Sequence, residues 1–171
     1  VTTDFDRALA TANKLDATFK NHELPLLFGI PVLHKDLVPT KDLRTTYGSP
    51  LYKDNIPKID GLIVQRLKEA GAVTLGKTNT PEFGLMGHTE NLLKDHCRTP
   101  WDHNKSAGGS SGGAGSAVAA GFCAIAMGGD AGGSIRIPSS YNGIFGIKPT
   151  QGRVPRRAFP VHNMISQGGP M

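Results

Sequence analysis

The sequence predicts an α/β fold. Short apolar runs typical of buried strands alternate with segments whose apolar residues recur at helical spacing. In a chain of 171 residues, this alternation favours a sheet covered by helices around a single core. No linker or internal repeat divides the chain, and residues 1–171 are therefore predicted to form one domain.

The first half of the chain contains two helical segments and two strand-like runs. Residues 4–20 predict an amphipathic helix, with Thr3 or Asp4 as its N-cap. One face of this helix is expected to gather four apolar side chains, Phe5, Leu9, Ala12 and Phe19. Residues 27–35 predict an apolar strand that Pro31 restricts to an edge or an entry position.

A second helix is expected over residues 60–70, capped by Asp60 and closed by Gly71. Residues 73–75 predict a short strand. The Thr80-Pro81-Glu82 sequence is typical of a cap followed by proline at the first helical position, and predicts a short helix there.

Small and apolar residues dominate the second half. Residues 114–121 predict a helix, and residues 122–127 and 144–147 predict buried strands.

Composition excludes several classes of protein. The net charge is +5, from 19 basic and 14 acidic residues, but the basic residues are scattered. Even the densest group, Arg153, Arg156 and Arg157, forms no stripe with interleaved aromatics, so no nucleic-acid partner is expected. Cys97 and Cys123 are too few for a disulfide framework or a zinc box. We expect neither a metal nor a cofactor.

The longest apolar stretch, residues 117–127, is too short to span a bilayer. No secretory signal is visible at the start. We therefore expect no membrane association and a cytoplasmic location.

Two serine-containing glycine clusters, Gly108–Gly113 and Gly129–Ser134, are the most informative feature of the chain. Flanking glycines let the backbone approach a reacting atom and leave N–H groups free to face it. These are the conditions that a serine nucleophile needs beside an oxyanion hole.

Other glycine-rich motifs fit this sequence poorly. A phosphate-binding P-loop requires lysine after its last glycine, and Gly112–Ser116 contains none. The dinucleotide fingerprint fails because Val118 occupies its final glycine position. The hydrolase elbow Gly-x-Ser-x-Gly fails because Ile135 and then Arg136 follow Ser134, so that no glycine occupies its last position.

A serine nucleophile needs a base, and Lys35 is the best candidate. It ends an apolar strand, which is where catalytic groups of α/β proteins are often found. Burial could lower its pKa enough to make it neutral. Taken alone, a lysine is more commonly exposed.

Five segments, in this order along the chain, carry a resemblance to the amidase signature family. Gly-Ile-Pro-Val-x-x-Lys-Asp matches Gly29–Asp36, Gly-Lys-Thr-Asn matches Gly76–Asn79, and Gly-Gly-Ser-Ser-Gly-Gly matches Gly108–Gly113. Gly-x-Asp-x-Gly-Gly-Ser-Ile-Arg-x-Pro matches Gly128–Pro138 apart from a one-residue offset in its opening glycines, and Gly146–Thr150 fits the last motif. The resemblance covers nearly the whole chain. It implies the amidase-signature fold, a mixed sheet covered by helices.

The family uses a Ser–cis-Ser–Lys triad. The resemblance implies that Ser134 is the nucleophile, that Ser110 is the bridging serine after a cis Gly109–Ser110 bond, and that Lys35 is the base. It also implies an oxyanion hole built from the N–H groups of four consecutive residues, Ala131, Gly132, Gly133 and Ser134.

Supporting roles are expected for Ser111, Asp130 and Arg136. The resemblance implies that Asp130 and Arg136 form an ion pair that holds the nucleophile loop, whereas spacing alone equally allows two independent solvated charges. Ser111 is expected to support its loop rather than react. The segment Phe83–Asn91 resembles one that borders the family's substrate cleft, and Met86 either lines a pocket or packs as an ordinary apolar residue.

The resemblance implies an amidase that hydrolyses a carboxylic amide. One alternative is the catalytic subunit of a tRNA-dependent amidotransferase, in which Ser-Ile-Arg-Gln-Pro is usual; here Ile137 replaces the glutamine, which favours hydrolysis. Another is an inactive truncated fragment with only a structural or binding role, because residues 1–171 are expected to be an incomplete amidase domain. The expected partner is a small-molecule amide, and a homodimer remains open.

Overall fold

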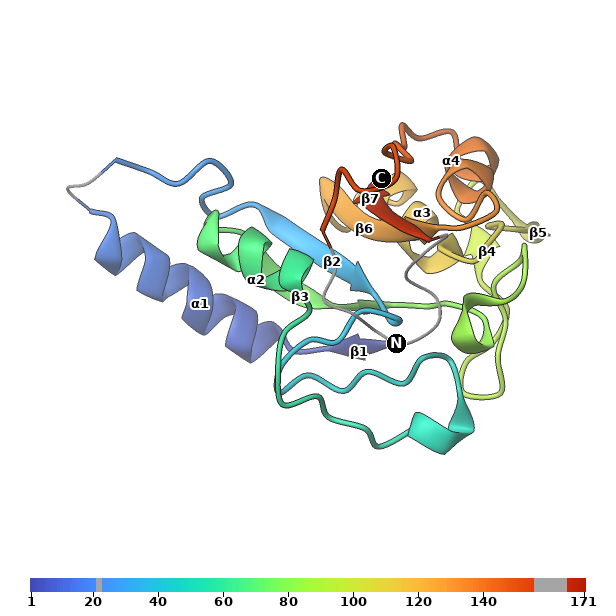
Figure 1. The fold of residues 1–171 in the computed structure, drawn as a ribbon, viewed down its shortest axis with the longest axis horizontal. Helices are drawn as coiled ribbons and strands as arrows, with labels where there is room; N and C mark the ends of the chain where they lie inside the picture. Colours follow the sequence, from blue (N-terminus) through green and yellow to red (C-terminus); the bar gives the residue numbers. More distant parts are fainter. Residues whose placement is uncertain (21–22, 156–165) are drawn as a thin grey trace.

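The computed structural model describes residues 1–20, 23–155 and 166–171. Its centre is a five-stranded sheet in the order β1-β3-β2-β6-β7 (Figure 1). The strands are β1 (Thr2–Thr3), β2 (Pro31–Lys35), β3 (Val73–Thr78), β6 (Ile125–Asp130) and β7 (Gln167–Pro170). β2 is parallel to β3 and β6, whereas β1 and β7 are antiparallel to their neighbours. The sheet is therefore mixed, and the expected α/β fold is confirmed.

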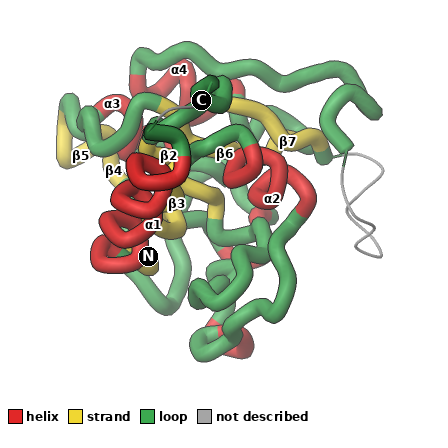
Figure 2. The backbone as a smooth tube through the Cα atoms, turned by 90° about the vertical axis from the view of Figure 1, so that its left-hand side faces the viewer, coloured by secondary structure: helices red, strands yellow, loops and turns green. Residues whose placement is uncertain are grey.

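In the described part of the chain, four helices accompany the sheet. They are α1 (Phe5–Thr18), α2 (Leu62–Glu69), α3 (Gly112–Ala119) and α4 (Arg136–Asn142). Figure 1 shows α1 and α2 toward its left and α3 and α4 toward its right. Two 3-10 turns, η1 (Pro50–Tyr52) and η2 (Glu82–Gly84), and a small antiparallel pair, β4 (Arg98–Thr99) and β5 (Asp102–Ser106), lie in the connections. Figure 2 shows β2, β3 and β6 in the middle of the molecule, β5 toward its left edge, and long loops around them.

The parallel strands bring three polar residues to one edge of the sheet. Carboxyl ends of parallel strands meet at the same edge, and here β2 ends at Lys35, β3 at Thr78 and β6 at Asp130. The core between sheet and helices consists mostly of small and medium side chains: Leu33, Ala114, Ala117, Cys123, Ala126, Ile135 and Met171. Cys123 is thus a buried apolar residue, as its surroundings in the sequence predict. The alanines of α3 allow this helix to approach the sheet closely.

The prediction of which residues form the buried face of α1 is wrong. Asp4 does cap the helix, accepting a hydrogen bond from the Arg7 N–H at 3.1 Å. Phe5 and Leu9 are nevertheless exposed, and Ala8 is the buried residue of the helix. The helix is rotated so that its small residue meets the sheet, and only its C-terminal flank follows the expectation: Phe19 packs edge-on against Phe28, with ring centroids 5.9 Å apart.

The cap of α2 also differs from the expectation. Gly61 occupies the N-cap position, because the carboxylate of Asp60 is engaged elsewhere. It accepts from the Lys41 N–H at 2.7 Å and from Nζ of Lys68 at 2.7 Å. Gly71 follows the C-cap with φ of 89°, as expected for the glycine that ends a helix.

In the second half, strands and helices are displaced from their expected positions. The strand expected over residues 122–127 begins at Ile125, and Phe122 is exposed. Residues 144–147 form no strand. The helix expected at Thr80 is the 3-10 turn η2, whose N-cap is Pro81. The helix α4 and the strand β7 were not foreseen.

Some expectations concern residues or features outside these elements. Arg156 and Arg157 lie outside the described residues. None of the helices in the described ranges is long and apolar enough to cross a membrane. Within the same ranges, no group of three or more His, Cys, Asp or Glu side chains could hold a metal ion.

Candidate active site

Lys35 and Ser110 are in direct contact. The Nζ atom of Lys35, at the end of β2, donates a hydrogen bond to Oγ of Ser110 at 2.6 Å and a longer one to the Gly129 carbonyl at 3.4 Å. Both side chains are buried, each being 2 % exposed. Ser110 follows a cis Gly109–Ser110 peptide bond, as the resemblance implies. A buried amine on a serine hydroxyl is suited to proton transfer.

The two glycine-rich loops are joined through Ser111. Its hydroxyl accepts from the Gly129 N–H at 3.2 Å and donates to the Gly129 carbonyl at 3.4 Å. Its N–H donates to the Ser134 carbonyl at 3.2 Å. Ser111 thus holds the segment of Ser110 against the segment of Ser134, which is the arrangement that a supporting role requires.

Ser134 lies between β6 and α4 and is half-buried. Within the described ranges, its hydroxyl makes no hydrogen bond to Ser110 or to another residue. The structure therefore brings Lys35 and Ser110 into contact and places the backbone of Ser134 next to them. It leaves the Ser134 hydroxyl without the second contact of the expected triad.

Asp130 and Arg136 form the ion pair, and not two independent solvated charges. Nε of Arg136 donates to Oδ2 of Asp130 and Nη2 donates to Oδ1, each at 3.0 Å. The carboxylate also accepts from the N–H groups of Gly133, Ile135 and Arg136. Burial raises the pKa of Asp130, but the Arg136 and backbone hydrogen bonds outweigh it and lower the pKa to about 2.

This network removes one expected donor from the oxyanion hole. The Gly133 N–H donates to Oδ1 of Asp130 at 2.7 Å, so it is not free to bind an oxyanion in this structure. Within the described residues, the N–H groups of Ala131, Gly132 and Ser134 donate to no protein acceptor. Three of the four expected donors therefore remain available.

A second buried lysine, Lys77, was not foreseen. It lies on β3 opposite His34 and is 2 % exposed. Burial lowers the pKa of its ammonium to about 7, against the opposing effect of the Asp36 carboxylate. Burial also raises the pKa of Asp36, whose Oδ2 accepts from the N–H and the hydroxyl of Thr46. Lys77 belongs to the motif Gly76–Asn79, and that motif was the signal in the sequence that could have singled it out.

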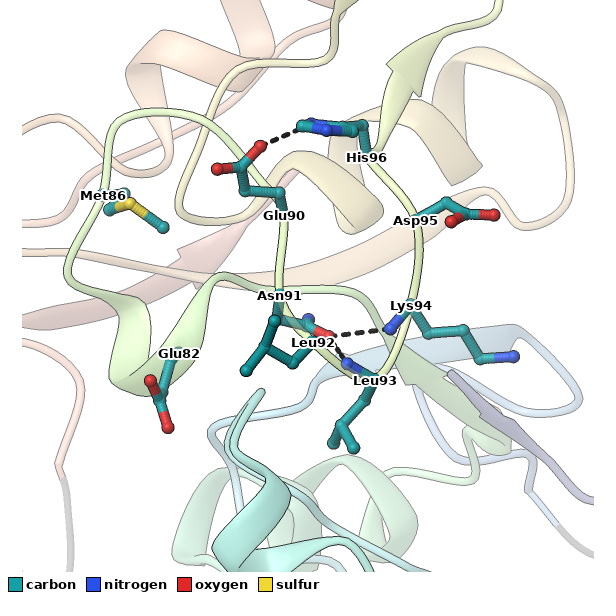
Figure 3. A pocket seen from close by; sticks show the side chains of 9 residues that line it. All are labelled: Glu82, Met86, Glu90, Asn91, Leu92, Leu93, Lys94, Asp95 and His96. Carbon is teal, nitrogen blue, oxygen red and sulfur yellow. Dashed lines mark hydrogen bonds and ion pairs between the residues drawn. The ribbon is translucent and has the colours of Figure 1, made fainter.

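A hollow of about 750 Å³ lies along residues 82–96. Nine residues line it: Glu82, Met86, Glu90, Asn91, Leu92, Leu93, Lys94, Asp95 and His96 (Figure 3). Met86 thus lines a pocket. The neighbouring Gly84 borders the site, because a Cβ atom placed on it would lie 3.4 Å from Oγ of Ser110.

On one wall of the hollow, the carboxylate of Glu90 contacts two histidine rings. Oε2 of Glu90 lies 2.5 Å from Nδ1 of His96 (Figure 3), and Oε1 lies 3.3 Å from Nε2 of His88. A turn in the lining segment is stabilised by Asn91, whose side-chain oxygen accepts from the N–H groups of Leu93 and Lys94 (Figure 3).

The arrangement of a buried lysine, a buried serine and a second serine before a helix agrees with the family comparison. The Amidase family matches residues 1–171 of this chain. The chain belongs to the amidase signature family, whose hydrolases act on C–N bonds.

Individual relatives within this family differ in what they are named for. A glutamyl-tRNA(Gln) amidotransferase subunit from Cupriavidus pinatubonensis is 47% identical over 169 residues, which are 98% of this chain and 34% of the relative. A bacterial aryl acylamidase structure superimposes with a TM-score of 0.92 at 32% identity, over 99% of this chain and 36% of that one. The structure of a glutamyl-tRNA(Gln) amidotransferase subunit from Thermotoga maritima gives a TM-score of 0.75 at 34% identity, over 95% of this chain and 38% of that one. The chain thus spans about a third of the length of these relatives.

Proposed function

We propose that this chain carries the catalytic centre of an enzyme that cleaves a carboxylic amide through an acyl intermediate on Ser134. The observation that carries the proposal is the buried contact of 2.6 Å between Nζ of Lys35 and Oγ of Ser110. A lysine removed from water at a serine hydroxyl has the geometry of a base and its proton relay.

In the proposed mechanism, neutral Lys35 takes the hydroxyl proton of Ser110 while Ser110 takes that of Ser134. Oγ of Ser134 attacks the amide carbonyl carbon, and the carbonyl oxygen becomes an oxyanion facing the free N–H groups of Ala131, Gly132 and Ser134. The C–N bond then breaks, and the proton returns through Ser110 to the leaving nitrogen. Water attacks the acyl-enzyme by the same relay and releases the acid.

This relay also needs a contact between the hydroxyls of Ser134 and Ser110. Within the described residues, that contact is not formed. We infer that rotation of the Ser134 side chain about its Cα–Cβ bond supplies it, because the Ser134 carbonyl already accepts from the N–H of Ser111, the residue after Ser110. Catalytic hydrogen bonds are often formed only when substrate is bound.

The destination of the released nitrogen distinguishes two functions. The names of the relatives at 44% to 47% identity support an amidotransferase subunit, in which the nitrogen would pass to glutamyl-tRNA(Gln). That assignment, the second hypothesis of the sequence analysis, is better supported than a general amidase. The cleavage chemistry on Ser134 is common to both.

One residue favours the stand-alone amidase as the second candidate. Ile137 replaces the glutamine that is usual in amidotransferases of this family, and it packs between the two serine loops. A Cβ atom on Gly133 would lie 2.9 Å from Cδ1 of Ile137, and one on Gly108 would lie 3.1 Å from its Cγ2. The contact between these loops is therefore apolar at this position, where a glutamine would add a polar group.

The test is covalent labelling of the whole protein that contains this chain with a fluorophosphonate probe. We expect the label on Ser134, and we expect Ser134→Ala to lose both labelling and amide turnover, by roughly 10⁶-fold. Ser140→Ala is the matched control, because Ser140 is an exposed serine of α4. Label on a different residue, or full turnover by Ser134→Ala, would refute the assignment.

Two further measurements separate the candidate functions. Turnover of simple amides in water alone identifies an amidase. Transfer of the amide nitrogen to glutamyl-tRNA(Gln) identifies an amidotransferase. Labelling of Ser134 without either activity would match the third hypothesis, a chain with only a structural or binding role.

A further inference from the structure

The ammonium of Lys77 has three oxygen acceptors within reach. Nζ donates to the Val38 carbonyl, to Oγ1 of Thr40 at 2.9 Å and to Oγ1 of Thr45 at 3.0 Å. All three belong to the loop that follows β2. A buried lysine is costly unless its protons are bonded, so this set of acceptors accounts for how the fold tolerates Lys77.

The hydroxyl protons of both threonines point away from Lys77. Oγ1 of Thr40 donates to the Val38 carbonyl at 3.2 Å, and Oγ1 of Thr45 donates to the Leu43 carbonyl at 3.1 Å. Each threonine oxygen therefore offers only lone pairs to Nζ. Three acceptors match the three protons of an ammonium, whereas a neutral amine could donate only two.

The same loop begins at Lys35. The Val38 N–H donates to the Lys35 carbonyl at 2.9 Å and closes a tight turn directly after the lysine. The carbonyl of Val38 is held by Lys77 on the far side of that turn. Two hydrogen bonds thus separate the ammonium of Lys77 from the backbone of Lys35.

The side chain of Leu37, in the middle of this turn, borders the site. A Cβ atom placed on Gly84 would lie 2.6 Å from Cδ1 of Leu37 and 3.4 Å from Oγ of Ser110. A displacement of the turn would therefore move groups on both sides of the Lys35–Ser110 contact.

We propose that Lys77 is a positioning residue: it anchors the turn after Lys35 and thereby fixes the direction from which Nζ of Lys35 meets Ser110. The inference rests on the proposed function in assigning the base role to Lys35. Lys77 itself touches no reacting atom. Displacements of about 1 Å can cost roughly 100-fold in rate.

The test uses variants on both sides of the contact in the whole protein. Lys77→Met keeps the apolar stem and removes the ammonium. Thr45→Val removes one acceptor, and Thr45→Ser keeps the hydroxyl. Lys105→Met is the matched control, because Lys105 is exposed and its Nζ lies 3.7 Å from Oδ2 of Asp102, away from the site.

We expect Lys77→Met to lower kcat per labelled active site by roughly 10- to 100-fold with little change in KM, because substrate contacts remain. Thr45→Val should lower it less, and Thr45→Ser should restore most of it. The Lys77→Met/Thr45→Val double variant should be no slower than Lys77→Met alone, since both act through one contact. Lys105→Met should equal the wild type.

A second readout does not depend on turnover. A crystal structure of Lys77→Met should show the hydrogen bond between Nζ of Lys35 and Oγ of Ser110 lengthened or broken. Hydrogen–deuterium exchange in solution should be faster for the backbone amides of residues 37–49. An unchanged distance, or an unchanged kcat per labelled site, would overturn the inference. A lengthened distance in a protein whose Ser134 proves inert would support the positioning role and refute only the proposed function.

Discussion

The contact between Lys35 and Ser110 limits which form of the lysine can act. An ammonium has three donors and no acceptor, so only the neutral amine can take a proton from Ser110. If Lys35 instead served only to place a positive charge near the oxyanion, its charged form would suffice. The two roles can be separated by changing the basicity of the side chain while keeping its charge.

Lys35→Arg makes this separation, because a guanidinium stays protonated in proteins. We expect Lys35→Arg and Lys35→Met to be equally inactive, each losing about 10³-fold or more in kcat/KM. Steady-state kinetics on the amide that the wild type turns over measures the loss. Substantial activity in Lys35→Arg alone would indicate an electrostatic role and contradict the base assignment.

At the scale of residues, the sequence was informative where a motif carries the chemistry. Lys35 and Ser110 are far apart in the chain, yet the motifs around them predicted their contact. Two features depend on side-chain directions that no motif encodes: the Gly133 N–H is taken by Asp130, and Lys77 reaches the loop after β2. Burial and hydrogen-bond geometry, and not residue type, reveal them.

At the scale of elements, local patterns predicted the central strands and the first three helices, although not the buried face of α1, and they failed where an element depends on non-local contacts. The central strands β2, β3 and β6 were foreseen because their apolar runs are continuous. By contrast, β7 exists only through its pairing with β6, and glycine and proline give it little strand propensity of its own. Residues 144–147 are apolar, yet they form no strand of the sheet. They lie beside β7, where the Ile147 N–H donates to the Pro170 carbonyl.

The helix α4 was missed because serine, asparagine and a proline give its sequence a low helical propensity. Its start is stabilised instead by Asp130, which accepts the N–H groups of Ile135 and Arg136 at 3.1 and 3.4 Å. Gly143 ends the helix in the left-handed conformation, with φ of 65°. The helix that follows Ser134 therefore depends on a buried carboxylate that precedes it.

We expect Asp130→Asn to destabilise the protein by about 3 kcal/mol, because an amide has one acceptor oxygen where the carboxylate has two and leaves Arg136 unpaired. Arg136→Gln should cost less, since the arginine side chain is 57% exposed. Urea unfolding of the whole protein measures both. Equal losses in the two variants would show that the ion pair between Asp130 and Arg136, and not the backbone hydrogen bonds to Asp130, stabilises the loop.

The stability difference between wild type and Asp130→Asn should depend on pH. The folded pKa of Asp130 lies near 2, below its ordinary value of 3.8, so the stabilisation of about 2 kcal/mol is complete above pH 3.8 and is lost as pH falls toward 2. The difference should be constant from about pH 7 to pH 5 and should shrink below about pH 4. A constant difference down to about pH 3 would contradict the lowered pKa.

At the scale of the whole molecule, the described part of the chain exposes many large apolar side chains. The most exposed of them are Leu26, Leu51, Leu92, Phe122 and Phe145. Among the described residues, no further strand pairs with the outer edges of β1 and β7, although the Ile147 N–H donates to the Pro170 carbonyl of β7. Exposed apolar surface and open sheet edges favour association with other chains.

We therefore predict that residues 1–171, purified alone, self-associate and show no Ser134-dependent amide turnover, although Lys35, Ser110 and Ser134 are all present. The N–H donors around Ser134 act best where water is excluded, and Ala131 and Gly132 are exposed here. Light scattering gives the oligomeric state, and an amide assay with Ser134→Ala as control gives the activity, each beside the whole protein. Monodisperse residues 1–171 with turnover equal to that of the whole protein would show that this third of the family's length is sufficient for catalysis.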